Sequence, residues 1–304
     1  MGFSALETNL QQLVNGLMLG SFYALVALGY SMVYGIIKLL NFAHGDVYMV
    51  GAFACLATFS VVGGFASGWL GIALSMLSAM IFCGILGYLA QRLAYRPLFS
   101  APRLSMLITA VGVSLVIYNA VMGITNSQYM FFEHSVDNSA GLAFGNITIT
   151  YIQIVILAIS AILMVALTRF IGGTMWGKAM RAISLDKDTC RLMGVNVNKV
   201  IGLTFFIGSA LAAVAGSMAC VYYGNLHYFM GYIIGMKAFT AAVVGGIGSI
   251  PGAMLGGLLL GLLEAFGTQY LGSAWKDVFA FGLLIIMLIF KPNGLLGKTE
   301  IERM

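Results

Sequence analysis

Charged side chains are scarce in this sequence. Asp, Glu, Lys and Arg make up 8% of its 304 residues, whereas soluble domains carry roughly 25%. Hydrophobic residues make up 61%, and the mean hydropathy is +0.98. The segments 8–37, 47–91 and 138–168 contain no charge, and each exceeds the roughly 20 residues that a helix needs to cross a bilayer. This composition excludes a soluble globular domain and predicts an all-α, polytopic helical membrane protein.

Cysteine is also rare, and its spacing indicates no chemistry. The four cysteines, Cys55, Cys83, Cys190 and Cys220, stand singly without a CxxC or CxxH pair, so neither a disulfide nor a metal site is predicted. No nucleophile, base and orienting group occur at a spacing that favours a catalytic centre. We therefore expect no cofactor and no enzymatic activity in this chain.

The basic residues cluster in three regions. The segment 169–199 carries Arg169, Lys178, Arg181, Lys187, Arg191 and Lys199 against Asp186 and Asp188; a loop carries Arg92, Arg96 and Arg103; and the tail carries Lys291, Lys298 and Arg303. Because Lys and Arg accumulate on the cytoplasmic side, these regions are predicted to lie inside. The loop 125–149, with Glu133 and Asp137 but no basic residue, is predicted outside, as is the N-terminus. The net charge of +5 thus has a topological explanation and does not indicate nucleic acid as a partner.

Apolar segments predict seven spans and one interrupted region. The spans are 13–37, 47–62, 69–91, 104–124, 150–168, 201–223 and 278–290, and the interrupted region is 236–266. Within it, the run 242–252 contains four glycines and a proline. The part before this break would reach only about 18 Å as a helix, short of a hydrocarbon core of about 30 Å. We expect seven to eight spans plus a re-entrant region, forming a single transmembrane domain over 1–304.

The break is a candidate lining for a transport pathway. If 169–199 and the tail are both inside, an even number of crossings must lie between them, and the spans 201–223 and 278–290 already supply two. The region 236–266 then makes no net crossing and is expected to be two half-helices dipping in from outside. Non-helical backbone at membrane depth persists only where protein or a water-lined cavity satisfies it, which points to Gly245, Gly246, Gly248, Pro251 and Gly252. The alternative is one long, kinked helix with the tail outside.

The segment 169–199 has a predictable local structure. Asp186 is expected to cap a short helix by accepting from the amides of Asp188 or Thr189, and Gly194 to end it in the left-handed conformation. Arg191 is expected to face solvent, while Cys190, Leu192 and Met193 provide an apolar side. Such a helix suits insertion into a groove on a partner protein. The alternative is an amphipathic loop that rests on lipid headgroups.

Asn41, His44 and Asp46 mark the entrance to the second span. Ionisable groups are costly there, which makes them candidates for the transport pathway. The competing interpretation is that Asn41 or Asp46 caps the helix that follows by meeting its free amides. A metal or proton site would need further ligands at matching spacing, and none occur nearby.

Two further features favour structural roles. Gly252, Gly256, Gly257 and Gly261 place small residues on helix faces, as in close helix crossings. Glu264 is interpreted first as a solvated charge at the outer rim and second as a gate residue. No ionisable group is expected well inside a span.

Several stretches resemble a known family. Asp188-Thr-Cys-Arg-Leu-Met-Gly194 resembles the E-A-A-x-x-x-G cytoplasmic loop of ABC-importer permeases, with Asp, Thr and Cys replacing Glu, Ala and Ala. The stretches NGLMLGSFYAL at 15–25, YGIIKLLNFAHGD at 34–46, YRP at 95–97 and MKAFTAAVVGGIGSIPGAMLGG at 236–257 resemble the permease of bacterial importers for leucine, isoleucine and valine. The similarity covers essentially the whole chain in order.

The resemblance implies a multi-pass inner-membrane permease subunit that hydrolyses nothing itself. Its implied partners are a second homologous permease, two cytoplasmic ATP-binding subunits and a periplasmic substrate-binding protein. The segment 169–199 would then be the ATPase-coupling loop, with Arg181, Asp186, Asp188, Arg191 and Gly194 as its key residues. Two rivals remain: a permease of the same class for urea, an amide or a sugar, and an ion-driven secondary transporter or channel.

Overall fold

The computed structural model describes residues 5–66, 68–99, 101–133, 136, 140–144 and 147–297. Lys298 and Arg303 of the expected basic tail, and Asp137 of the expected outer loop, lie outside these residues. Eight described helices are long and apolar enough to cross a membrane. They are built on α1 (Ala5–Ile37), α2 (His44–Val62), α3 (Gly68–Ala90), α4 (Arg103–Ile124), α5 (Tyr151–Gly173), α8 (Val197–Tyr223), α10 (Ile250–Leu271) and α11 (Lys276–Phe290). The predicted polytopic helical membrane fold is confirmed.

Shorter elements join the long helices. Beyond α3 the chain continues through a π-helical turn (Gln91–Tyr95) and a 3₁₀ turn (Arg96–Leu98), and another 3₁₀ turn (Ser273–Trp275) precedes α11. The helices α6 (Met175–Leu185) and α7 (Lys187–Leu192) follow α5, and α9 (Met230–Gly245) is the shorter apolar helix before α10. The antiparallel strand pairs are β1 (Met130–Phe131) with β4 (Asn225–Leu226), and β2 (Gly141–Phe144) with β3 (Ile147–Thr150).

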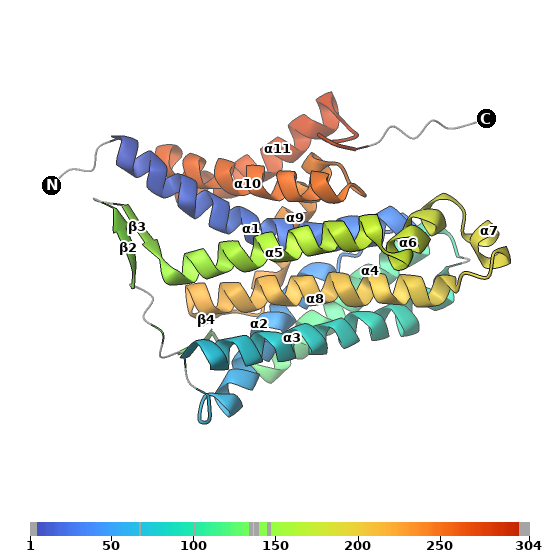
Figure 1. Cartoon of the computed structure of the whole chain (residues 1–304), viewed down its shortest axis with the longest axis horizontal. Helices are drawn as coiled ribbons and strands as arrows, with labels where there is room; N and C mark the ends of the chain where they lie inside the picture. The colour runs from blue at the N-terminus through green and yellow to red at the C-terminus, as the bar shows by residue number, and fades with distance from the viewer. Residues whose placement is uncertain are drawn as a thin grey trace.

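The two ends of the bundle carry different elements. Figure 1 shows β2 and β3 at one end and α6 with α7 at the other, with α1, α5 and α8 running between them. Gln11 fixes the strand end of α1, because its side chain donates to the Thr148 carbonyl at 3.1 Å and accepts from the Thr148 amide at 3.0 Å. The segment 169–199 and the strands β2 and β3 of the predicted outer loop therefore lie at opposite ends, as the charge distribution predicts.

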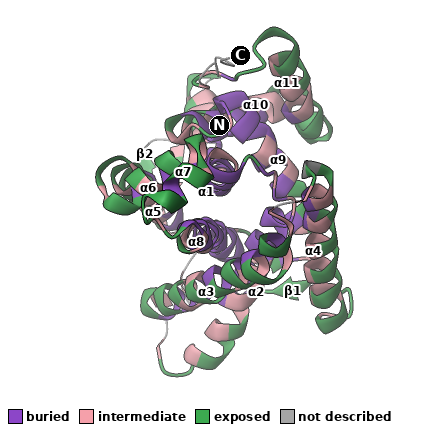
Figure 2. Cartoon of the chain, turned by 90° about the vertical axis from the view of Figure 1, so that its right-hand side faces the viewer, coloured by how far each residue is buried: buried purple, intermediate pink, exposed green. Residues whose placement is uncertain are grey.

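Burial separates inner helices from outer helices. Viewed from the end that carries α6 and α7, α1 and α8 are largely buried, whereas α4 and much of α11 are exposed (Figure 2). The outer helices expose large apolar side chains such as Val116 and Ile289. In a bilayer these surfaces can contact lipid at no hydrophobic cost. The buried helices α1 and α8 form the interior around which the site residues are arranged.

Glycine allows α1 and α10 to pack backbone against backbone. A Cβ atom added to Gly261 would lie 2.2 Å from the Gly20 amide nitrogen, and one added to Gly257 would lie 2.4 Å from the Ala24 Cα. On another face of α10, a Cβ on Gly256 would lie 2.1 Å from the Ala241 carbonyl oxygen of α9. The predicted role of these glycines in close helix crossings is confirmed.

The interrupted region forms a helical hairpin. In one continuous helix, Ala241 and Gly256 would lie about 22 Å apart at 1.5 Å per residue, but here they are in contact. The single kinked helix is therefore excluded. The prediction of two half-helices is also wrong, because α10 has 22 residues and is long enough to span, while α9 has 16. The break lies beside Gly35, near the end of α1, rather than at mid-depth.

The tail after α11 closes the break. The Leu295 amide donates to the Val244 carbonyl at 2.8 Å, and the Leu296 amide donates to the Gly245 carbonyl at 2.9 Å. These bonds satisfy carbonyl groups that the end of α9 would otherwise leave without a partner. The start of the tail is thus fixed at the end of the bundle where α1 ends, which is the end that carries α6 and α7.

A buried ion pair joins α9 to α10, which corrects two predictions. The Lys237 Nζ lies 2.9 Å from Glu264 Oε1, with side-chain exposures of 2% and 5%, and 2.8 Å from Asp277 Oδ1 of α11. Tyr23 of α1 donates its hydroxyl to Glu264 Oε2 at 2.7 Å. Glu264 is therefore not a solvated rim charge, and ionisable groups do lie inside the helical bundle. Their mutual pairing offsets the cost of burying them.

We expect Gly261→Ala to destabilise the fold. The added methyl group would force the backbones of α1 and α10 apart, and overpacking of this kind costs about 1–3 kcal/mol. Thermal unfolding of the purified protein in detergent should show a lower Tm. Gly112→Ala is the matched control, because a Cβ there meets nothing within 4 Å and alanine favours a helix interior. An equal effect of both changes would contradict this account of α1–α10 packing.

Removing one partner of the Lys237–Glu264 ion pair should destabilise the fold. Lys237→Met should lower the Tm strongly, because removing one partner of a buried pair costs about 3–5 kcal/mol. The double variant Lys237→Met/Glu264→Gln removes the stranded charge but keeps an acceptor for Tyr23, so it should recover much of the loss. Asp277 tolerates the change because its side chain is 58% exposed. A double variant less stable than the single variant would show that the pair does not act as described.

Candidate functional site

The segment 169–199 connects α5 to α8 through the short helices α6 and α7. Thr174 accepts a hydrogen bond from the Gly177 amide at 3.1 Å, which starts α6, and donates to the Phe170 carbonyl at 2.7 Å, which closes α5. Arg181 donates from its guanidinium to the carbonyl of Ile171 and, at 3.4 Å, to that of Gly172. A cation near these carbonyls also interacts favourably with the C-terminal end of the α5 dipole. The hydrogen bonds of Thr174 and Arg181 hold α6 against the end of α5.

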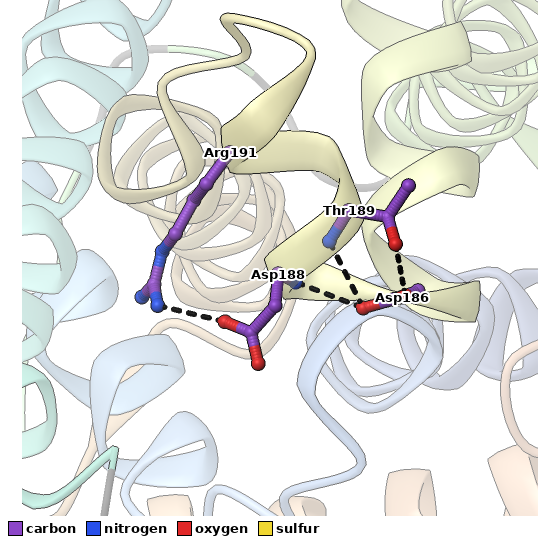
Figure 3. Close-up of polar contacts among 4 residues, drawn as sticks. All are labelled: Asp186, Asp188, Thr189 and Arg191. Atoms are coloured by element: carbon purple, nitrogen blue, oxygen red, sulfur yellow. Dashed lines mark hydrogen bonds and ion pairs between the residues drawn. The ribbon is translucent and has the colours of Figure 1, made fainter.

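Asp186 caps α7 as the sequence predicts. Its Oδ1 accepts from the Asp188 amide at 2.9 Å and from the Thr189 amide at 3.2 Å, and its other oxygen accepts from the Thr189 hydroxyl (Figure 3). The hydrogen bond from the Thr189 hydroxyl, followed by those from the two amides, lowers the pKa of the Asp186 carboxyl. The cap is therefore ionised at neutral pH and complements the N-terminus of the helix.

The other end of α7 is closed by Gly194. Its φ of +83° lies in the left-handed region, and the Val195 amide reaches back to the Cys190 carbonyl at 3.0 Å. This six-residue closure is the Schellman motif, so the predicted left-handed ending is confirmed. Arg191, as expected, faces solvent, where it pairs with Asp188 at 3.0 Å (Figure 3).

The apolar residues of this loop divide into two groups. Cys190 is 8% exposed and packs in a hydrophobic cluster with residues of α6 and α8, including Ile183 and Val197. Leu192 is 88% exposed and Met193 is 79% exposed, and Leu185 before α7 is 90% exposed. The expected single apolar side of Cys190, Leu192 and Met193 is therefore wrong, because Cys190 points inward. We refer to Leu185, Leu192 and Met193 together with Arg191 as the tip surface.

The entrance to α2 has an arrangement that the capping interpretation does not explain. Its N-cap residue is Ala43, and no side chain caps it. Asn41 instead accepts from the Tyr95 hydroxyl at 2.7 Å, and Asp46 accepts from the Ser114 hydroxyl of α4 at 2.5 Å. His44 is 1% exposed and packs against Gly29, with the Tyr30 ring 4.9 Å away. Capping by Asn41 or Asp46 is wrong, and their candidate pathway role stays a prediction.

The break brings together residues that lie far apart in the sequence. Gly248, with φ of +90°, lines a cavity of about 100 Å³ whose other walls include Ser31 of α1 and Arg181 of α6. Gly245 and Gly252 instead contact each other across the hairpin, where their tight packing leaves no room for a side chain. Gly246 lies against the tail residue Gly297. Of the glycines proposed as pathway lining, Gly248 is therefore the one that borders this cavity.

Sequence reasoning missed Lys237 and Ser31. Lys237 is the only Asp, Glu, Lys or Arg residue between Lys199 and Glu264, and a lone charge within an apolar stretch is a signal that could have identified the buried pair. Ser31 carries no comparable signal, because a serine in a membrane helix usually bonds the backbone of its own helix.

Comparison with known proteins agrees with this architecture. Residues 12–288 match the family described as branched-chain amino acid transport system / permease component. The chain is 46% identical to the high-affinity branched-chain amino acid transport system permease protein BraD of Pseudomonas aeruginosa, over 97% of each chain. It is 43% identical to the corresponding permease protein LivH of Escherichia coli K12, again over 97% of each chain.

A solved structure supports the fold independently. It is an inward-facing conformation of a metal-chelate type ABC transporter, which superposes with a TM-score of 0.51 over 94% of this chain and 88% of that chain, at 16% sequence identity. At this identity the likeness shows the fold alone. The match over 12–288 and the two close relatives show the family: this chain is a multi-pass membrane protein that belongs to the branched-chain amino acid transport system permease components.

Proposed function

We propose that this chain is the permease subunit of an ATP-driven ABC importer that carries branched-chain amino acids across the bacterial inner membrane. The tip surface is the observation that carries the proposal. It presents Leu185, Leu192 and Met193 beside Arg191 on a loop whose helices are capped at both ends. Three large apolar side chains this exposed at the end of a membrane protein are best explained by a groove on a partner that covers them.

The proposed partners follow from the family resemblance and from the lack of a predicted catalytic centre in this sequence. ATP binding and hydrolysis would reside on two cytoplasmic subunits, and a second homologous permease would complete the membrane part. A periplasmic binding protein would deliver the solute at the end of the bundle that carries β2 and β3. The segment 169–199, the start of the tail and the partner ATPases would then share the cytoplasmic side.

The connections of the tip surface suggest how a partner drives transport. Movement of α7 would pass to α8 through the packing of Cys190 and Val197, and movement of α6 would pass to α5 through Thr174 and Arg181. Because α8 packs against the buried α1, a shift of the loop would reach the interior of the bundle. This gives the ATPases a mechanical route to alternate access on the two sides of the membrane.

The alternative that the loop rests on lipid headgroups is less well supported. A headgroup-bound amphipathic helix carries Lys and Arg on one face and apolar side chains on the other. The helix α7 instead carries Asp188 in a surface ion pair with Arg191, beside the fixed negative charge of Asp186. Carboxylates at this position favour a protein partner over an anionic membrane surface.

Different observations argue against the two rival functions. A permease of the same class for urea, an amide or a sugar has the same loop, and the two close relatives argue against it through their named solutes. An ion-driven transporter needs ionisable groups inside the bilayer, and the sequence predicts none there. The buried pair of Lys237 and Glu264 removes that argument against it. Membership of the permease family argues against an ion-driven transporter. An uptake experiment distinguishes it from an ATP-driven importer.

Uptake of radiolabelled leucine tests the proposed function. The permease, purified with its associated subunits and reconstituted in proteoliposomes, should take up leucine when the binding protein and ATP are present. Uptake should persist when an uncoupler removes the proton gradient, because the energy comes from ATP. Uptake that requires the gradient but not ATP would support an ion-driven transporter. Transport of urea or a sugar in preference to leucine would support the other rival.

Variants of the tip surface test the docking assignment. Leu192→Asp/Met193→Asp should abolish leucine uptake and the stimulation of ATPase activity by binding protein, because two charges would enter an apolar groove. Phe65→Asp is the control, since Phe65 is 94% exposed and follows α2 rather than lying on the loop. Both variants should retain the wild-type Tm. Full uptake by the Leu192→Asp/Met193→Asp variant would refute docking at this surface.

A further inference from the structure

A small cavity lies where α1, α6 and the α9–α10 break meet. Its volume is about 100 Å³, and its polar lining comes from Ser31, Arg181 and Ser184. Pockets that enclose a whole ligand are usually about 300–1,000 Å³. This cavity is thus large enough for the head group of a small molecule but not for the whole molecule. No acidic residue is among its described lining residues.

Ser31 has a hydroxyl group that the described part of the chain leaves without a partner. The residue is 1% exposed, and its Oγ makes no hydrogen bond there. A serine within a helix can usually bond the carbonyl one turn earlier, so its unpaired state is notable. A buried hydroxyl without a partner is costly, and this one lines the cavity. It therefore leaves a donor and an acceptor available to a polar group in the cavity.

Arg181 supplies positive charge to the same space. Two of its N–H groups hold the carbonyls of Ile171 and Gly172. A guanidinium has five donors in a planar arrangement that matches a carboxylate. The bonds to α5 thus fix the position of the side chain and leave further donors for a ligand.

The break adds backbone donors. Ile250 begins α10, a helix of 22 residues capped by Ser249, and both Ile250 and Gly248 line the cavity. Within the described residues, the Gly248 and Ile250 amides have no backbone acceptor. The N-terminus of a helix carries the positive end of its dipole and binds anions readily. The Arg181 guanidinium and the amides at the start of α10 thus favour an anion, and the serine hydroxyls can donate to it.

We propose that this cavity binds the carboxylate of a small monocarboxylate, namely the head group of the transported amino acid. The inference rests on the proposed function for the identity of the solute. Ser31 and the Gly248 amide would donate hydrogen bonds to the carboxylate, and Arg181 would pair with it. The site joins α1, the break and α6 of the coupling loop. A movement of α6 would therefore withdraw Arg181 and weaken the hold on the solute.

Equilibrium binding to the purified complex tests the proposal. The probes are radiolabelled L-leucine, 4-methylpentanoate, which keeps the carboxylate but lacks the ammonium, and leucinol, which lacks the carboxylate. Leucine and 4-methylpentanoate should bind to the complex without the binding protein, and leucinol should not compete. Ser31→Ala and Arg181→Gln should each weaken binding about tenfold, the typical effect of losing a hydrogen bond to a charged group.

Ser75→Ala is the matched control. Ser75 is another buried serine whose hydroxyl has no partner in the described chain, but it lies in α3 and does not line this cavity. The variant should bind both probes as the wild type does. Tight binding of leucinol, no binding of 4-methylpentanoate, or wild-type affinity in both Ser31→Ala and Arg181→Gln would overturn the carboxylate site. Wild-type leucine uptake in the same preparation would leave the proposed function intact, whereas its absence would count against that function itself.

Discussion

The ion pair between Lys237 and Glu264 is the interaction on which the arrangement of α9, α10 and α11 depends. A single charge in the interior of a membrane protein is costly, so each of these residues requires the other. Lys237 also pairs with Asp277 at the start of α11, and Glu264 accepts from Tyr23 of α1. Four helices therefore meet at one ion-paired and hydrogen-bonded cluster. The glycines of α10 then allow the close backbone approach to α1 and α9 that brings these groups within bonding distance.

The opposite end of the α9–α10 hairpin is held by different interactions. The hairpin turns at Gly246 and Gly248, whose positive φ angles only glycine adopts readily. Tail amides pair with the last carbonyls of α9, and Ser249 caps α10. The hairpin is thus bonded at both ends, while the cavity beside Gly248 leaves space on the side of α6. In the proposed importer, a fixed hairpin next to a loop that a partner moves would couple ATP hydrolysis to solute release.

Much of the fold could be predicted from the sequence, because hydrophobic length and the distribution of basic residues determine which segments span and which ends meet. The caps of α7 were also predictable, since Asp186 and Gly194 act through local backbone geometry. Long-range contacts were not. The distance between Lys237 and Glu264 depends on the hairpin, and the hairpin depends on packing between glycines of different helices. The same limit applies to Ser31 and Arg181, which α1 and α6 bring to one cavity through contacts that no sequence spacing encodes.

The central claim is that the tip surface lies in the cytoplasm and is covered by an ATPase. The Met193→Cys variant tests it directly, because Met193 is 79% exposed while Cys55, Cys83, Cys190 and Cys220 are buried. A membrane-impermeant maleimide should not label this variant in sealed cells. It should label the variant in inverted vesicles stripped of the ATPase subunits, and adding those subunits back should protect the cysteine. Labelling in sealed cells, or no protection by the ATPases, would contradict the account.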